Sequence, residues 1–407
     1  MVLPRSSPIF SALRRQRHAC WRASWHRRAL KVSSGIPHPL ARIFVQAAQQ
    51  AGIPFAADFN GGRQEGTGFY QATTRSGRRC STASCYLRPA IDRKNLLVRT
   101  DAFATRIKLE RGHAVGVEIA ESGFVRTFRA EREVIVTAGA IGSPKLLMLS
   151  GIGPAAHLRQ TGVEVVHDLP GVGQNLQDHL DVGVLAELSG PFGLDRYKKR
   201  RWQLIAGLEY LLYARGPIAS NLIEGGAFWW GDRAEQTPDL QFHFLPGAGS
   251  VPGGNGLTLN SYHLRPRSRG SVLLRSADPR SSPMIDLNAF ADPYDLDRTI
   301  DGVAMSREIL SQPAFRPFVR REHAPGERAV TRADLSAFAR QHFRSACHTV
   351  GTCRMGGGLD AVVDPMLRVR GIEALRVSDS SIMPRLISSN TNAATIMIAE
   401  KAADLIA

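Results

Sequence analysis

The sequence predicts a mixed α/β fold in which a domain built on an antiparallel sheet is inserted between two parts of another domain. Three observations predict it. Residues 133–140 form an apolar run that ends in small residues and precedes a helix-like segment, the order typical of an α/β unit. Residues 185–345 instead carry the apolar and polar alternation of antiparallel strands. Residues 374–407 return to strand, turn and helix, which indicates that the middle segment is an insertion.

The individual elements follow from local patterns. Apolar residues at helical spacing predict a helix within 35–54, ended by Gly52 and Pro54. Strands are expected at 96–100, 104–109, 114–119, 240–245, 261–265 and 271–276, with a turn at 110–113. Further helices are expected at 143–153, 200–214, 296–312 and 390–407. The last of these is predicted to be mainly core, with Ala394, Ile398 and Ala402 along one face.

Composition places the chain among globular proteins. Its 407 residues are 43% hydrophobic and 22% charged, which favours two or three folded domains over disorder. The sequence has no uninterrupted apolar stretch of the ~18 residues that a spanning helix needs. The five cysteines form an odd set without a CxxC pair. This pattern argues against a disulfide scaffold and a cysteine zinc site, and we expect a reducing compartment and no metal.

The formal charge of +16 is concentrated at the start of the chain. Residues 1–57 contain nine Lys or Arg and no acid, so the rest is only mildly basic and nucleic-acid binding is not expected. Residues 1–30 resemble a transit peptide or a basic membrane-surface helix. We favour a disordered basic head instead, because apolar periodicity is weak there.

A complete dinucleotide fingerprint is not found. Residues 151–156, GIGPAA, match GxGxxA in letters but follow a helix-like segment instead of a strand, so we reject this match. Residues 171–176, GVGQNL, lack the third small residue.

Four longer motifs carry a family resemblance. They are GAIGSPKLLMLSGIGP at 139–154, GVGQNLQDH at 171–179, HTVGTCRMG at 348–356, and the segment 375–406 that contains SSNTNA. Together, and in this order, they resemble the glucose-methanol-choline (GMC) oxidoreductases, most closely the choline dehydrogenase and alcohol dehydrogenase branch. The resemblance covers roughly residue 31 to the end. It implies FAD as cofactor and oxidation of an alcohol to an aldehyde by hydride transfer to flavin N5.

The resemblance also implies two catalytic residues. His348 matches the family's general base, which accepts the hydroxyl proton of the substrate; an imidazole suits this step because its ordinary pKa is near neutrality. Asn390 matches the second active-site position, from which an amide can donate to the forming alkoxide. The alternatives are a core or capping histidine for His348 and a helix N-cap for Asn390.

Five more positions are implied to bind the cofactor. Ala138, Gly139 and Ala140 match the family strand that passes beneath FAD, although glycine there also permits tight packing. Asp379 matches a residue near the ribityl and phosphate region, where an acid otherwise caps a turn. Asn392 opens the last helix, whose positive end is expected to face the flavin.

The substrate is less well indicated. Glu224, with Phe228, Trp229 and Trp230 after it, has the chemistry to bind a quaternary ammonium such as choline. We favour an ordinary sheet residue beside an interior aromatic cluster. The electron acceptor is expected to be a quinone or oxygen, and a cyanohydrin lyase is a minor alternative that rests on the resemblance alone.

The resemblance also has a gap. Family members begin with a strand, a GxGxxG turn and a helix for the ADP half of FAD, and this sequence lacks them. We therefore expect an N-terminally truncated member with an incomplete FAD-binding Rossmann-like domain at 31–184, an antiparallel substrate domain at 185–345, and a C-terminal part of the FAD domain at 346–407. One hypothesis is an active FAD enzyme. The other is a flavin-free inactive fragment, with a separately encoded N-terminal half as a partner. A cytoplasmic location is expected, with peripheral membrane contact as an option.

Overall fold

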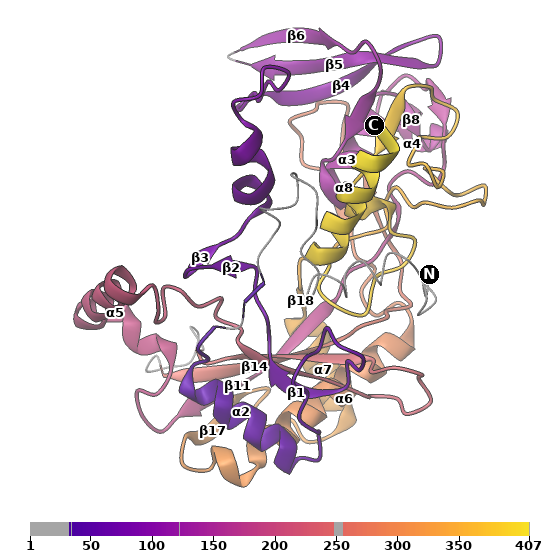
Figure 1. The fold of residues 1–407 in the computed structure, drawn as a ribbon. Helices are drawn as coiled ribbons and strands as arrows, with labels where there is room; N and C mark the ends of the chain where they lie inside the picture. Colours follow the sequence, from indigo (N-terminus) through magenta and orange to yellow (C-terminus); the bar gives the residue numbers. More distant parts are fainter. Residues whose placement is uncertain (1–31, 34, 122, 248–254, 407) are drawn as a thin grey trace. The chain divides into compact units, whose positions relative to one another are not determined.

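The computed structural model describes residues 32–33, 35–121, 123–247 and 255–406, and the chain divides into two compact units (Figure 1). Unit 1 consists of residues 1–98, 181–263 and 296–344, and unit 2 of residues 99–180, 264–295 and 345–407. The expected mixed α/β class is confirmed, because antiparallel and parallel strands occur together with helices. The basic head predicted at 1–30 lies outside the described residues.

The unit boundaries differ from the predicted domains in two places. Residues up to 98 belong to unit 1, because their helix packs on the antiparallel sheet and their first strand is part of it. Residues 264–295 belong to unit 2, because their strand at 270–273 pairs with the strand at 174–176 of that unit. The chain also passes from one unit to the other after residues 180 and 344.

Unit 1 is built on a seven-stranded sheet with antiparallel neighbours along its main path. In sheet order the strands are β1 (Gly66–Phe69), β12 (Gly225–Trp229), β13 (Leu240–Leu245), β14 (Gly256–His263), β11 (Leu180–Leu188) and β17 (Val319–Ala324), with β18 (Arg344–Ser345) also paired to β11. Along β11, buried residues alternate with partly exposed ones, as one covered face requires. The strands predicted at 240–245 and 261–265 are confirmed as β13 and the end of β14.

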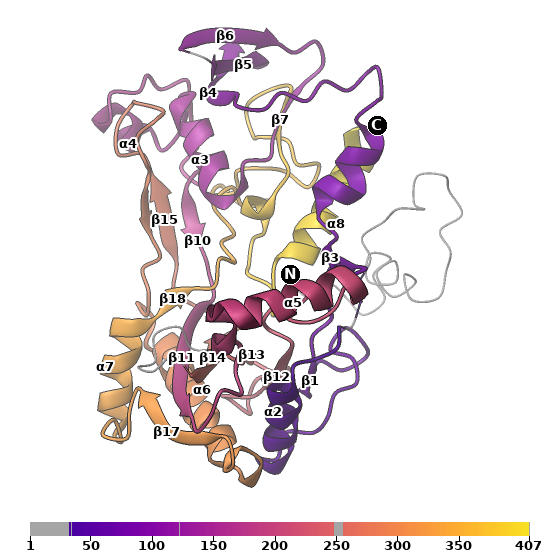
Figure 2. The same cartoon turned by 90° about the vertical axis from the view of Figure 1, so that its left-hand side faces the viewer.

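A helix of the described chain packs directly against strands of this sheet. The predicted N-terminal helix is confirmed as α2 (Pro39–Gln50), which lies beside β1 and β12 in Figure 2 and stacks Phe44 on Phe244 with 5.1 Å between ring centroids. The other helices of this part of the chain are α5 (Arg200–Tyr213), α6 (Pro293–Ser311) and α7 (Arg332–His342). A capping box at Thr331 and Asp334 fixes the start of α7. Helix α5 is unusual, because Ala206 is its one buried residue while Leu204, Leu208 and Leu211 are exposed.

The smaller elements of unit 1 connect these parts. They are the hairpin β2 (Thr74–Arg75) and β3 (Arg78–Arg79), the π-helix Ala83–Leu87, and the 3₁₀ helices Arg88–Ala90, Leu194–Lys198 and Pro313–Phe315. The strand predicted at 96–100 is wrong. These residues are exposed and pair with no strand of the described chain, and Leu97 is 77% exposed. Their apolar side chains do not form a strand because no neighbouring strand lies beside them.

Unit 2 contains the α/β part. Strand β7 (Val134–Val136) pairs in parallel with β19 (Leu375–Val377), and α3 (Gly139–Leu149) follows β7. The other strands are β4 (Phe103–Glu110), β5 (His113–Glu121), β6 (Phe124–Arg129), β8 (Ile152–Gly153), β9 (His167–Asp168), β10 (Gln174–Leu176), β15 (Gly270–Leu273) and β16 (Met284–Asp286). The remaining helices are α4 (Ala155–Gln160), the 3₁₀ helix Ser380–Ile382 and α8 (Asn392–Ile406).

The predictions for unit 2 are largely confirmed. Strands β4, β5 and β15 and helix α8 lie close to their predicted ranges, whereas β6 was not predicted. Helix α3 starts four residues before the predicted 143–153 and ends at Leu149, and the last predicted residues form β8 instead. Helix α8 is not mainly core: Ala402 is buried, but Ala394 and Ile398 are half-buried. Ala402 belongs to the unit 2 core, and Ile398, Leu405 and Ile406 pack against that core while remaining partly exposed.

Candidate active site

Two segments that are distant in the sequence run side by side in unit 2. Gln177 and Val350 exchange both backbone hydrogen bonds, at 3.1 and 3.0 Å, and the amide of Ala346 donates to the carbonyl of His179 at 2.9 Å. The first segment lies between β10 and β11, and the second contains the motif that begins at His348. This pairing brings His179 and His348 to the same place.

The side chain of Gln177 ties a third segment to this pair. Its Nε2 donates to the carbonyl of Pro384 at 3.2 Å, and its Oε1 accepts from the amide of Leu386 at 3.1 Å. Gln177 is 3% exposed, so these bonds replace water. The segment that leads to Asn390 is thereby fixed against the segment that precedes His179.

A sharp turn presents His348. Its preceding residue, Cys347, has a φ of +60°, a conformation that is costly for a residue with a side chain. Asp178 holds this turn, since its carboxylate accepts from the backbone amide of His348 at 2.9 Å and from the hydroxyl of Ser345. Burial raises the pKa of Asp178, while the hydrogen bonds from Ser345 and from the backbone oppose that rise.

His348 lies between two side chains. Its Nε2 is 3.0 Å from Nδ2 of Asn390, and its Nδ1 is 3.0 Å from Nδ1 of His179. The ring is half-buried, and burial lowers its pKa from 6.5 to about 4. His348 is therefore neutral at pH 7, with one ring nitrogen able to accept a proton.

The structure brings the two predicted catalytic residues together, although they are 42 positions apart. Asn390 is exposed and lies two residues before α8, whose first backbone bond runs from the amide of Thr395 to the carbonyl of Thr391 at 3.0 Å. Thr391 is thus the residue at the N-cap position, and the amide of Asn390 points to His348.

Four of the five predicted cofactor residues follow the carboxyl ends of the parallel strands β7 and β19. Ala138 and Gly139 follow β7, and Asp379 follows β19. Ala138 is exposed, Gly139 has a φ of +76°, and a Cβ at Gly139 would extend into open space. Ala140 is buried, and its carbonyl accepts from Thr352 Oγ1 at 2.5 Å. Asn392 is exposed at the first turn of α8.

Asp379 joins the two loops at this edge. One carboxylate oxygen accepts from the amide of Gly139 at 2.9 Å and from Ser143 Oγ at 2.5 Å, and the other accepts from the amide of Ser381 at 2.8 Å. Asp379 is 6% exposed. These three donors satisfy the carboxylate of Asp379. Burial, together with the nearby carboxylate of Asp379, raises the pKa of the Cys353 thiol far above its ordinary range.

The sequence reasoning missed Asp178 and His179. Both belong to the GVGQNLQDH motif that helped to establish the resemblance, but no role was assigned to them. An acid and an imidazole at the end of a glycine-punctuated loop were the available signal.

Glu224 has a structural role in unit 1. Its carboxylate accepts from the backbone amide of His38 at 2.5 Å and from Ser220 Oγ at 2.7 Å, so it stabilises the start of α2. Phe228 and Trp229 are 2% and 9% exposed, which confirms the interior aromatic cluster that the sequence favoured.

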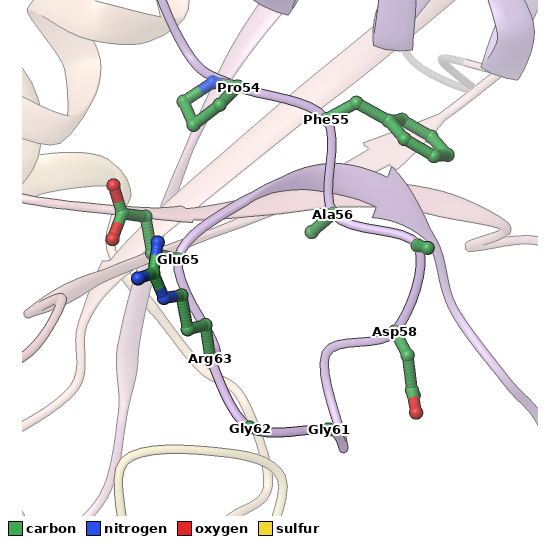
Figure 3. Close-up of a pocket in the computed structure, with 9 residues that line it drawn as sticks. Pro54, Phe55, Ala56, Asp58, Gly61, Gly62, Arg63 and Glu65 are labelled. Carbon is green, nitrogen blue, oxygen red and sulfur yellow. The ribbon is translucent and has the colours of Figure 1, made fainter.

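A pocket of about 340 Å³ lies on unit 1, lined by residues of the loop from Pro54 to Glu65 (Figure 3). Arg63 extends beside Glu65 on one side of it, and Asp58 points away from them. None of the predicted catalytic or cofactor residues lines this pocket. In the described part of the chain, no three or more His, Cys, Asp or Glu side chains are arranged to hold a metal ion.

Comparison with known proteins assigns the family. The GMC oxidoreductase models match residues 12–181 (N-terminal) and 266–399 (C-terminal). The chain is 45% identical over 384 residues to an oxygen-dependent choline dehydrogenase of Sinorhizobium medicae (strain WSM419), covering 92% of this chain and 70% of that one. A second such enzyme, from Brucella canis (strain ATCC 23365 / NCTC 10854 / RM-666), is 45% identical over 90% of this chain and 68% of its own length.

The structure of this chain also aligns with solved structures of other oxidoreductases. Pyridoxine 4-oxidase from Mesorbium loti aligns with a TM-score of 0.80 and 29% identity over 91% of this chain and 70% of that one. Formate oxidase of Aspergillus oryzae RIB40 aligns with a TM-score of 0.86 and 26% identity over 93% of this chain and 72% of its own. The chain belongs to the GMC oxidoreductase family, whose members act on CH–OH groups.

Proposed function

We propose that this chain binds FAD and oxidises a primary alcohol of the choline class to the aldehyde, with His348 as the general base. The observation that carries this proposal is the 3.0 Å contact between Nε2 of His348 and the amide of Asn390. It joins a neutral proton acceptor and a hydrogen-bond donor at one point, which is the pair that alcohol oxidation requires.

In this proposal the substrate hydroxyl replaces the Asn390 N–H at Nε2 of His348, and Nε2 then accepts the hydroxyl proton. Burial keeps the ring neutral, so the lone pair is available throughout the neutral pH range. Once the substrate hydroxyl occupies Nε2, the Asn390 amide beside it is suited to donate to the substrate oxygen as its negative charge develops.

The carboxyl edge of β7 and β19 fits a dinucleotide cofactor. The positive φ of Gly139 and the open space beyond it leave the backbone accessible to a bound group. We assign Ala138, Gly139, Ala140, Asp379 and Asn392 to holding FAD, with Asp379 acting through the two loops that it joins. When bound, FAD supplies the two-electron acceptor for a hydride from the substrate carbon. The start of α8 adds partial positive charge, which suits an anionic ligand.

The relatives named oxygen-dependent choline dehydrogenase support choline-like alcohols as substrates and oxygen as the electron acceptor. Choline recognition through Glu224 is not part of this proposal, since that carboxylate is engaged at the start of α2.

The test is spectroscopic and kinetic. The protein purified from its host is expected to be yellow, and anaerobic choline is expected to remove the visible flavin absorbance. His348→Gln should lower turnover by about 10² to 10⁴ without loss of flavin, the range for a lost general base. His342→Gln, at an exposed histidine of α7, is the matched control and should keep full turnover. Full turnover in His348→Gln would remove His348 from the mechanism.

The alternative of a flavin-free chain is decided by the same preparation. A colourless protein that acquires neither flavin nor turnover when FAD is added would contradict the proposal. A second polypeptide that completes the flavin site remains a prediction, tested by whether co-purified protein is needed for the yellow colour.

Peripheral membrane contact also remains a prediction. No helix within the described residues is long and apolar enough to cross a bilayer. Support for surface contact comes from α5, which exposes Leu204, Leu208 and Leu211 and begins with Arg200 and Arg201. Co-sedimentation of the protein with anionic vesicles, compared with neutral vesicles, tests membrane contact. Absence of the protein from both vesicle pellets would refute this prediction.

A further inference from the structure

His179 makes two well-defined contacts through its ring nitrogens. The side chain is 0% exposed. Its Nε2 lies 3.0 Å from the carbonyl oxygen of Leu264, and its Nδ1 lies 3.0 Å from Nδ1 of His348. The two rings are nearly perpendicular, at 86°, with 5.1 Å between their centroids.

These contacts determine where the hydrogens are. A carbonyl oxygen only accepts, so Nε2 of His179 must carry a hydrogen. A neutral imidazole has one N–H, and a charged ring at 0% exposure would be costly. Nδ1 of His179 is therefore the acceptor, and the hydrogen between the two rings belongs to Nδ1 of His348.

The hydrogen bond between His348 and Asn390 has the same donor-to-acceptor direction. With its hydrogen on Nδ1, His348 has its lone pair on Nε2, the atom that faces the Asn390 amide at 3.0 Å. The opposite tautomer would place two lone pairs together at His179 and two donors together at Asn390. Leu264, His179, His348 and Asn390 thus form one directed chain of hydrogen bonds.

We infer that His179 is a positioning residue that holds His348 in the Nδ1–H tautomer and so keeps the proton-accepting lone pair on Nε2. The inference rests on the proposed function for its consequence in catalysis. The tautomer itself is a property of this chain, and it is measurable without turnover.

Three substitutions separate this role from simple packing. His179→Asn places an amide oxygen near the position of Nδ1 and keeps an acceptor for His348. His179→Gln reaches the carbonyl of Leu264 but lacks that acceptor, and His179→Leu lacks both. A packing role would make Asn and Leu similar, whereas a positioning role makes Asn alone resemble the wild type.

The primary readout is long-range ¹⁵N–¹H NMR of protein labelled at histidine, with the His348 signals assigned by their loss in His348→Gln. The wild type and His179→Asn are expected to show a protonated Nδ1 and an unprotonated Nε2 at His348. His179→Leu and His179→Gln are expected to show mixed tautomers. A protonated Nε2 at His348 in the wild type overturns the inference, as does an unchanged tautomer in His179→Leu.

Kinetics of the flavin-loaded enzyme give the second readout. His179→Leu should lower kcat by about 10- to 100-fold with KM unchanged, the cost of one buried hydrogen bond, and His179→Asn should recover to within roughly threefold. If the wild-type tautomer is as inferred but His348→Gln retains full turnover, the proposed function fails while the tautomer assignment stands. If His179→Leu does not fold, the wild-type spectrum and His179→Asn still decide the inference.

Discussion

Replacing Asp379 with Asn is expected to destabilise unit 2 by about 2–4 kcal/mol, because one carboxylate serves three donors there. Its two oxygens accept from the amide of Gly139, the hydroxyl of Ser143 and the amide of Ser381. Asn offers one oxygen, so its NH₂ group must face either the N–H of Gly139 or that of Ser381. One buried backbone N–H then loses its acceptor, at a cost of about 1–3 kcal/mol, and the remaining bonds lose charge assistance worth roughly 1 kcal/mol.

This loss is a large fraction of the ~5–15 kcal/mol that stabilises a typical domain. Urea unfolding followed by circular dichroism measures it. Hydrogen exchange in peptides from 134–143 and 375–383 should locate the loss at the two loops that Asp379 joins. Flavin content should fall in parallel if these loops hold the cofactor.

Asp168→Asn is the matched control for this prediction. The carboxylate of Asp168 is exposed and accepts from one backbone amide, that of Ala155 at 3.0 Å, which an Asn oxygen can replace. We expect a change within about 0.5 kcal/mol for it. If Asp379→Asn also stayed within that range, the three hydrogen bonds would not stabilise this edge as argued.

Three further predictions follow from other parts of the structure. The pKa of His348 falls from 6.5 to about 4 on folding, so the unfolded chain takes up a proton at this ring first as the pH drops. The stability that the neutral ring contributes is therefore complete above pH 6.5 and is lost towards pH 4, by up to roughly 3 kcal/mol. Over this pH range the unfolding free energy of the wild type should fall by that amount relative to His348→Gln. Gln177→Leu should cost about 2 kcal/mol, because the buried amide of Leu386 loses its acceptor and the carbonyl of Pro384 keeps only the donor from Asn175. Thermal unfolding should show this loss, and an unchanged Tm would contradict that account. Thr331→Ala should cost about 1 kcal/mol by removing the cap of α7, whereas Thr331→Ser should keep the cap and the wild-type stability in the same assay.

Much of the fold follows from local patterns. Strand β13 has the predicted bounds, since its residues alternate and have β-forming side chains. The segment 96–100 has similar letters but remains exposed, and β6 was missed although it completes a sheet with β5. Both errors have the same cause, because strand formation depends on a neighbouring strand that local sequence does not reveal.

The site could be predicted only in part. Motif context singled out His348 and Asn390, and the structure places them 3.0 Å apart. His179 was not recognised, because what an imidazole does depends on the groups that face its two nitrogens. One of these is a backbone carbonyl at Leu264 and the other is a side chain 169 positions away, and neither leaves a mark in the local sequence.

The proposed base His348 and the residues that contact or position it, namely Asn390, His179 and Asp178, all belong to unit 2. The seven-stranded sheet of unit 1 contributes none of them. Substitutions across that sheet can therefore accumulate while the acid–base apparatus stays intact.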